Sequence, residues 1–369
     1  MAFPVNNRIP FVSILFLFIL GSLGAGCRAE IGRVPAIYVF GDSTADVGNN
    51  NYLTGSGVAK ANFPHNGIDF PSRRPTGRFS NGYNGIDFLA MHMGFKRSPP
   101  PSLSITGKSS IQILRGSRGA NFASAGSGIL DSTGSTITLS KQVELFASIK
   151  SNITARITSE AANDAISKSI FILSTGGNDI FAFFSRNNTP TSNEKASFVG
   201  TLVWEFKGHV EELYNLGGRK FGVVDIPPIG CCPYPRSLNP LGGCIDTLNE
   251  LAQSFNQAVK DMMHGLSYTL GGFKYSIGSS YAVVQNIIKD PHALGIKEIK
   301  TACCGSGKFN GQSSCMPNST ICWNRHEFLF WDMLHPTHST SKLAALAIYT
   351  GSQQFASPVN FRQLVEDQS

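Results

Sequence analysis

Residues of the types that carry out acyl transfer stand at two widely separated places in the sequence, with Ser43 near the start and Asp332 and His335 near the end. A serine attacks an acyl group when a general base takes its proton and a carboxylate holds that base in the right tautomer. Asp332 lies three residues before His335, and on a turn this spacing lets the carboxylate contact the imidazole directly. Among the eight histidines, His335 is the best candidate base, because Asp332 precedes it and Pro336 fixes the backbone after it.

Ser43 taken alone has two interpretations. It follows the apolar residues 36–40, which are rich in β-formers and end at Gly41, so a strand that runs into a tight turn is predicted. Serine is also a favoured first residue of a helix, and Asp46 follows three residues later, close to the capping-box pattern. The local sequence therefore allows Ser43 to be a nucleophile or a helix cap.

Two other predicted strands also end in small or polar residues. Residues 119–123 predict a strand that leads to a run of small residues around Gly126, and residues 169–174 predict a strand that leads to Asn178 and Asp179. In an open parallel sheet, ligands bind beyond the carboxyl ends of the strands. We therefore expect these residues to meet Ser43 at one edge of a sheet.

The remaining chain alternates between strand and helix patterns. Strands are predicted at 36–40, 119–123, 169–174, 220–226 and 273–277, and helices at 85–93, 139–149, 159–167, 197–216, 249–270 and 281–290, with a last helix after His335. Such alternation predicts the α/β class, with a doubly wound parallel sheet in a three-layer α/β/α sandwich. Residues 49–104 are rich in Gly, Pro and Asn and predict a long loop region, which in a compact domain usually serves a site.

The first 29 residues predict a secretory signal peptide. Arg8 supplies a weakly positive start, residues 11–20 are almost wholly apolar, and residues 21–29 are mostly small. The apolar stretch is too short to span a bilayer comfortably, so no stable membrane span is expected. Residues 30–369 are expected to form a single domain, because 41% hydrophobic content supplies a large core and no linker interrupts the chain.

Charge and cysteine content fit an exported protein. The formal charge is +7 for the whole chain, and its basic residues are scattered, so binding to nucleic acid is not expected. Seven of the eight cysteines lie in the second half, at positions 231, 232, 244, 303, 304, 315 and 322. Disulfides are expected in an exported chain, with one cysteine left over. The alternative, a zinc site among the last four, lacks both CxxC pairing and a histidine at a suitable spacing.

Sequons for N-glycosylation begin at Asn152, Asn187 and Asn318, as is common in exported proteins. No GxSxG motif occurs in the sequence, so the nucleophile elbow of the larger α/β hydrolases is not indicated. No HExxH motif occurs either, and no metal ion is expected.

Four short blocks occur in an order that resembles the plant branch of the GDSL esterase/lipase family, whose members are also called SGNH hydrolases. They are Phe40-Gly-Asp-Ser43 with Asp46-Val-Gly-Asn-Asn50, Gly119-Ala-Asn-Phe-Ala-Ser-Ala-Gly126, Gly176-Gly-Asn-Asp179 and Asp332-Met-Leu-His335-Pro336. Residues 75–82, 229–233 and 302–305 also resemble this branch, so the similarity extends from about residue 35 to residue 350. Each block is short, but their ordered conjunction is highly specific.

The resemblance implies a role for each matching residue. Ser43 would be the nucleophile, His335 the base and Asp332 the acid that orients the base. The backbone N–H groups of Ser43 and Gly126 and the side-chain amide of Asn178 would form the oxyanion hole. The resemblance also implies a flavodoxin-like sheet with a five-stranded parallel core, and neither a metal nor a cofactor.

The sequence departs from the family pattern at two positions. Thr44 stands in place of the leucine of the GDSL name, which concerns the acyl pocket rather than the chemistry. His338 stands where plant members commonly have glutamate, and we expect an effect on the start of the last helix. Gly128, two residues beyond Gly126 in the same run, is an alternative oxyanion residue.

We therefore expect a secreted serine esterase or lipase that hydrolyses carboxylic esters through an acyl-serine intermediate, located in the apoplast or cell wall. The family acts on lipids, acetylated polysaccharides and phenolic esters, so its expected partner is a small or polymer-bound ester. Two alternatives stay open: an acyltransferase of the cutin-synthase type with the same three residues, and a non-catalytic secreted binding protein.

Overall fold

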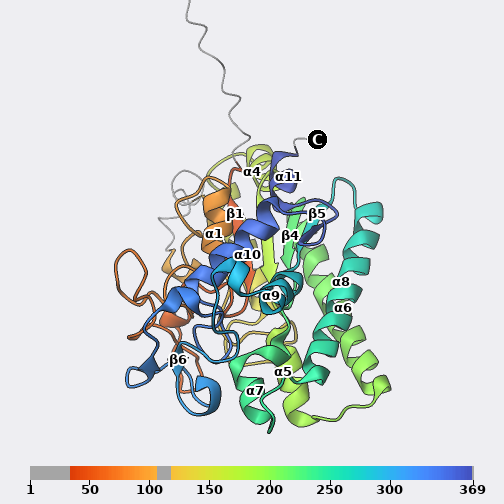
Figure 1. The fold of residues 1–369 in the computed structure, drawn as a ribbon. Helices are drawn as coiled ribbons and strands as arrows, with labels where there is room; N and C mark the ends of the chain where they lie inside the picture. The colour runs from red at the N-terminus through yellow and green to blue at the C-terminus, as the bar shows by residue number, and fades with distance from the viewer. Residues whose placement is uncertain (1–33, 106–117, 368–369) are drawn as a thin grey trace, which may run out of the picture. The chain divides into compact units, whose positions relative to one another are not determined.

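The computed structural model describes residues 34–105 and 118–367, which contain one large central sheet (Figure 1). Its strands are β1 (Ile37–Gly41), β2 (Gly119–Asn121), β3 (Ile170–Ser174), β4 (Lys220–Val224), β5 (Lys274–Gly278) and β8 (Ala356–Ser357). The order across the sheet is β2-β1-β3-β4-β5-β8. The first five strands run parallel, as predicted, and β8 pairs antiparallel with β5.

Helices connect the strands and cover both faces of the sheet (Figure 1). They are α1 (Gly85–His92), α3 (Leu139–Thr154), α4 (Ser159–Ser167), α5 (Gly177–Arg186), α6 (Ser192–Asn215), α7 (Pro233–Leu238), α8 (Asp246–Thr269), α9 (Ser280–Lys289), α10 (His338–Thr350) and α11 (Phe361–Glu366). Within the described ranges, none of these helices combines the length and the apolar character needed to cross a membrane.

Strand β1 shows how the layers arise. Successive side chains of a strand point to opposite faces of the sheet. Tyr38 and Phe40 are buried against α3, α4, α6 and α8 on one face, and Ile37 and Val39 are buried with α1, α10 and α11 on the other. A strand that is apolar at every position is typical of a sheet covered on both sides. The predicted three-layer α/β/α class is therefore confirmed.

Several elements differ from the sequence prediction, and three of them have a clear physical reason. Helix α3 continues to Thr154, beyond the predicted end at residue 149, because buried Ile153 extends its apolar stripe. Helix α5 was not expected, since the glycines at 176 and 177 indicate only a turn; Gly176 makes that turn with a φ of 108°, and the helix begins at once after it. Strand β8 has two residues, too few for any alternation pattern.

Three disulfides cross-link the second half of the described chain. They join Cys231 to Cys244, Cys303 to Cys322 and Cys304 to Cys315, and buried Cys232 is the one cysteine of the described residues without a disulfide. The prediction of disulfides is confirmed, and the zinc alternative is wrong because its four cysteines are bonded to one another. The predicted leader, residues 1–29, lies outside the described residues.

Candidate active site

The structure brings Ser43, His335 and Asp332 into one hydrogen-bonded line. Ser43 Oγ lies 2.7 Å from Nε2 of His335, and Nδ1 of His335 lies 2.8 and 2.9 Å from the two carboxylate oxygens of Asp332. A carboxylate has no hydrogen to donate, so Nδ1 of a neutral His335 carries the proton and Nε2 is free to accept one. The line therefore has the polarity that would move the Ser43 proton to the imidazole.

The three-residue spacing of Asp332 and His335 is built into a tight turn. Oδ1 of Asp332 accepts hydrogen bonds from the backbone N–H groups of Leu334 and His335, at 2.9 and 2.8 Å. The same oxygen therefore fixes the turn and contacts the imidazole. Both side chains are about nine-tenths buried, at 7% and 10% exposure, which protects the pair from competing water.

Opposing influences set the pKa of His335. Burial disfavours the imidazolium and lowers the pKa, whereas the charge of Asp332, its hydrogen bond and the charge of Asp42 raise it. The net result is a pKa above the ordinary value for histidine. A raised pKa makes His335 a stronger proton acceptor than a free imidazole.

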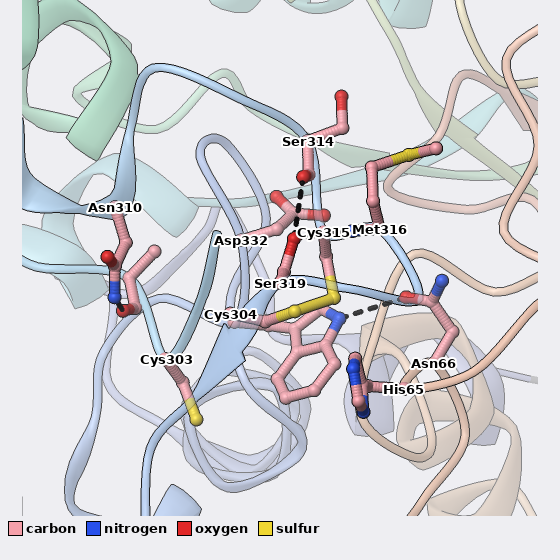
Figure 2. Close-up of a disulfide and its surroundings, with 12 residues drawn as sticks. His65, Asn66, Cys303, Cys304, Asn310, Ser314, Cys315, Met316, Ser319 and Asp332 are labelled. Atoms are coloured by element: carbon pink, nitrogen blue, oxygen red, sulfur yellow. Dashed lines mark hydrogen bonds between the residues drawn. A yellow bond between two sulfur atoms is a disulfide. The ribbon is translucent and has the colours of Figure 1, made fainter. Parts of the chain in front are cut away.

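The disulfide-linked segment supports the turn from below (Figure 2). The Cys304 N–H donates to the carbonyl of Trp331 at 2.7 Å, and the Trp331 N–H donates to the carbonyl of His335 at 2.7 Å. Trp331 is fully buried, and its indole N–H donates to Asn66 Oδ1 at 3.0 Å. The residue cross-linked to Cys315 is thus hydrogen-bonded to the backbone of Trp331, which directly precedes Asp332.

Ser43 lies in a turn at the end of β1, and no helix of the described chain begins there, so the helix-cap interpretation is wrong. Oδ1 of Asp42 accepts from the backbone N–H and the hydroxyl of Thr44, at 2.9 and 2.7 Å. Gly41 precedes this turn with a φ of 144°, and a Cβ there would lie 2.0 Å from the carbonyl oxygen of Ser174. Only glycine fits at that position.

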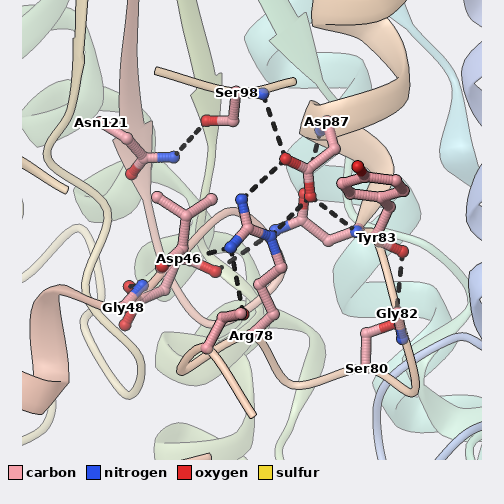
Figure 3. Close-up of polar contacts among 12 residues, drawn as sticks. Asp46, Gly48, Arg78, Ser80, Gly82, Tyr83, Asp87, Ser98 and Asn121 are labelled. Carbon is pink, nitrogen blue, oxygen red and sulfur yellow. Dashed lines mark hydrogen bonds and ion pairs between the residues drawn. The ribbon is translucent and has the colours of Figure 1, made fainter. Parts of the chain in front are cut away.

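Asp46, Asn49 and Asn50 clamp the turn of Ser43 to the segment after β2 (Figure 3 shows Asp46 and its surroundings). The carboxylate of Asp46 accepts from the N–H groups of Gly48, Asn49 and Ala125 at 2.7, 2.8 and 3.1 Å. The Asn50 amide donates to the Ala125 carbonyl at 2.9 Å. Burial raises the pKa of Asp46 to about 6, against the lowering effect of these N–H groups.

A buried ion pair lies beside this clamp (Figure 3). Arg78 contacts the carboxylate of Asp87 through Nε at 2.7 Å and through Nη2 at 2.8 Å. Asn84, the first residue before α1, donates to the Asp46 carbonyl at 3.2 Å and caps the helix through the Asp87 N–H. Arg78, in the family-like segment 75–82, and Asn84 therefore tie α1 to the segment that follows the turn of Ser43.

Of the three predicted oxyanion donors, Ser43 and Asn178 line the cavity of the site, and Gly126 does not. The Asn178 amide, in the first turn of α5, donates to the Ser127 carbonyl at 2.8 Å and lines the same cavity as Ser43 and His335. Within the part of the chain that the structure describes, the N–H groups of Ser43 and Gly126 donate to no acceptor. Gly126 is not among the residues that line the cavity, which has a volume of about 60 Å³.

Gly128, the alternative to Gly126, has a different surrounding. A Cβ on Gly128 would lie 2.3 Å from a carboxylate oxygen of Asp179. Asp179 accepts hydrogen bonds from Ile129 N–H, Leu130 N–H and the Thr133 hydroxyl, at 2.8, 3.1 and 2.7 Å. Gly128 thus makes room for the carboxylate that orders this loop, whereas a Cβ at Gly126 would meet nothing closer than 3.7 Å.

His338 connects α10 to the loop that packs on the predicted base. Its backbone N–H donates to Asn81 Oδ1 at 2.8 Å, and its Nδ1 accepts from the Tyr83 N–H at 3.0 Å. In the same loop, the centre of the Phe79 ring lies 5.0 Å from the centre of the His335 ring. We expected His338 to affect the start of the last helix. Its side chain also binds Tyr83, in a loop that is distant in sequence.

The remaining predicted positions lie outside this cluster of contacts. Asn152 and Asn318 are exposed, in α3 and in the loop after Cys315. Asn187 is half-buried and donates to Glu194 Oε1 at 3.4 Å. Across residues 34–105 and 118–367, no group of three or more His, Cys, Asp or Glu side chains is arranged to hold a metal ion.

Comparison with known proteins gives a consistent match over nearly the whole chain. Residues 37–348 match the model of a family described as GDSL-like lipase/acylhydrolase. The Arabidopsis thaliana protein GDSL esterase/lipase At5g55050 is 35% identical, over 98% of this chain and 99% of its own length. A second Arabidopsis protein, GDSL esterase/lipase At4g16230, is 36% identical over 90% and 91%.

Two solved bacterial structures are also similar. The extracellular lipase from Streptomyces rimosus covers 84% of this chain, with 98% of its own length, at 14% identity and a TM-score of 0.34. The phospholipase A1 from Streptomyces albidoflavus covers 85%, with 98% of its own length, at 14% identity and a TM-score of 0.32.

Proposed function

This chain belongs to the GDSL-like lipase/acylhydrolase family, and from that membership we propose that it hydrolyses carboxylic esters through an acyl-serine intermediate on Ser43. The observation that carries the proposal is the line from Ser43 through His335 to Asp332, with the acceptor nitrogen of His335 2.7 Å from the serine hydroxyl. This distance lies within the reach that proton transfer requires.

In the first half of the reaction, Ser43 Oγ attacks the carbonyl carbon of the ester while His335 Nε2 takes the hydroxyl proton. Asp332 stabilises the resulting imidazolium through the bond to Nδ1. When the tetrahedral intermediate collapses, His335 returns the proton to the leaving alkoxide, and the C–O bond to the alcohol breaks. The products of this half are a free alcohol and an acyl group on Ser43.

In the second half, water takes the place of the alcohol. His335 removes a proton from the water, whose oxygen attacks the acyl carbon, and then returns the proton to Ser43 Oγ as the carboxylic acid leaves. Both halves pass through an oxyanion on the substrate's carbonyl oxygen. N–H groups of Ser43, Gly126 and Asn178 would stabilise it, each lowering the activation barrier by about 3 kcal/mol.

Asn178 suits this role because its amide group carries two hydrogens. One of them binds the Ser127 carbonyl and fixes the side chain, and the other is available to a ligand. An amide is neutral at every working pH, so its contribution does not depend on titration. The Ser43 and Gly126 N–H groups, which lack acceptors in the described chain, would add two more donors.

The expected site of action is outside the cell, in the apoplast or cell wall. Residues 1–29 have the pattern of a secretory leader, and three disulfides persist best in an oxidising compartment. Exposed Asn152 and Asn318 would accept glycans during export. The substrates in that place would be lipid, acetylated polysaccharide or phenolic esters.

The test compares the wild-type protein with Ser43→Ala on p-nitrophenyl esters. We expect kcat to fall by about 10⁴-fold or more, because the nucleophile is lost. The matched control is Ser185→Ala, an exposed serine on α5, which should keep wild-type activity. A Ser43→Ala enzyme that retains a tenth of the activity would contradict the acyl-serine mechanism.

A further inference from the structure

A second cavity adjoins the one that contains Ser43 and His335. Its volume is about 130 Å³, and Thr44, Ser174 and Leu334 are among the residues that line both cavities. Beyond them, most of its wall consists of apolar side chains from α1, α9 and α10, including Leu89, Val284, Ala344 and Ile348. The cavity therefore begins at Thr44, next to the predicted nucleophile in the chain, and extends between the sheet and α10.

Most of the polar groups in its wall are already bound to protein atoms. The Thr44 hydroxyl donates to Asp42 Oδ1 at 2.7 Å and lies 2.9 Å from Ser174 Oγ. The carboxylate of Asp225 accepts from the Ser279 hydroxyl at 2.7 Å and from the Tyr281 N–H at 2.9 Å. A polar occupant would find few free partners here, so the cavity suits an apolar group.

We propose that this cavity binds the acyl chain of the ester, and that the preferred acyl group has no more than about six carbon atoms. The inference rests on the proposed function, since it concerns the substrate of the same serine. A cavity of about 150 Å³ lined by Leu, Ile and Phe is known to hold benzene, so 130 Å³ has room for a group of about that size. Long fatty acyl chains would not fit.

The order of the reaction assigns the cavity to the acyl group rather than the alcohol. The alcohol leaves after the first half, and water must then reach the same place. The acyl group stays on Ser43 through both halves, so a separate, mostly apolar cavity can hold it throughout without obstructing water. Thr44, the position that departs from the family's leucine, stands at the junction of the two cavities.

The experiment measures kcat/KM for p-nitrophenyl acetate, butanoate, hexanoate, octanoate and dodecanoate. With the leaving group constant, we expect kcat/KM to rise about fourfold for each added carbon up to hexanoate, because each buried methylene favours binding. For acyl chains longer than hexanoate, kcat/KM should fall. A profile that is flat, or that rises through dodecanoate, would overturn the proposal.

Ala344→Leu fills the cavity from α10, and Ala347→Leu is its matched control. Both alanines are half-buried on the same helix, but Ala347 does not line the cavity. We expect Ala344→Leu to lose at least tenfold of the preference for hexanoate over acetate, and Ala347→Leu to keep the wild-type profile. Equal profiles for the two variants would overturn the assignment.

Val284→Ala enlarges the cavity from α9 and serves if Ala344→Leu does not fold. It should shift the optimum to a longer chain, and an unchanged optimum would contradict the proposal. The series also separates this inference from the function on which it rests. If no ester is cleaved, the proposed function fails; if Ser43-dependent cleavage of acetate is seen without any chain-length optimum, only the cavity assignment fails.

Discussion

The two halves of the candidate active site are held in place by different means. The turn with Asp332 and His335 rests on a backbone that is cross-linked by the disulfide of Cys304 and Cys315. The turn with Ser43 is held by buried hydrogen bonds, above all those of Asp46. One half is therefore constrained by covalent bonds, and the other by a network that contains an ionisable group.

The difference teaches which conditions each half should tolerate. A disulfide is insensitive to pH but is lost under reduction, whereas a buried carboxylate responds to pH and not to reductant. Burial raises the pKa of Asp46 to about 6, so its ionised form is held at a cost in folding free energy. Perturbing the halves separately should therefore give distinct signatures.

The largest effect is expected for Asp332→Asn. This replacement removes the negative charge next to His335 and keeps the shape of the side chain at position 332. Loss of the orienting carboxylate should lower kcat by about 10⁴-fold. The variant also tests the pKa of His335, which in the wild type lies above the ordinary value of about 6.5. Because the protonated imidazole cannot act as the base, kcat/KM of the wild type should fall as the pH drops below this raised pKa. Without the charge of Asp332, burial prevails and this midpoint should move down.

The measurement is a pH–rate profile from pH 4 to 9 on p-nitrophenyl butanoate. Asp261→Asn, an exposed aspartate on α8, is the control and should keep both the rate and the midpoint. A midpoint that stays the same or rises in Asp332→Asn would show that Asp332 does not set the basicity of His335.

The next largest effect is expected when the covalent constraint is removed by replacing Cys304 and Cys315 together with alanine. The disulfide closes a segment of 11 residues, for which the chain-entropy model predicts a loss of about 3 kcal/mol in the free energy of unfolding. Activity should fall by at least tenfold, because the disulfide fixes the backbone of Cys304, whose N–H holds the Trp331 carbonyl next to Asp332.

The matched control is the double replacement of Cys231 and Cys244, which are 13 residues apart and lie around α7. It should lose a similar free energy of unfolding, measured by urea denaturation, but less activity. Equal losses of activity in the two double variants would show that the position of the Cys304 disulfide beneath Trp331 has no special importance.

The two halves also differ in how far the sequence predicts them. The contact of Asp332 with His335 is local, so a spacing of three residues was enough to expect it. The proximity of Ser43 and Asn178 followed from the rule that parallel strands end at one edge. The bonds of Asp46 to Ala125 and of His338 to Tyr83 join residues 79 and 255 positions apart, and they depend on a loop geometry that no sequence pattern encodes.

The smallest effect is expected for Asp46→Asn, and it tests the polar half directly. Because the pKa of Asp46 is raised in the folded state, the folded protein binds more protons than the unfolded chain between about pH 4 and 6, and stability falls as the pH rises through this range. Between pH 4.5 and 7, Asp46 should thus lower the free energy of unfolding by about 2 kcal/mol. Asparagine cannot titrate, so the variant should lack this component.

The measurement is urea denaturation of the wild type, Asp46→Asn and Asp261→Asn at both pH values. The difference between the two pH values should be smaller in Asp46→Asn by about 2 kcal/mol and unchanged in Asp261→Asn. The asparagine side chain also presents an amide hydrogen where Asp46 accepts from Ala125, so kcat should fall about tenfold while KM changes little. The Gly126 N–H, one of the proposed oxyanion donors, follows Ala125 directly in the chain. An unaltered kcat with the expected change in stability would therefore show that the clamp supports the fold of this half but not the position of that donor.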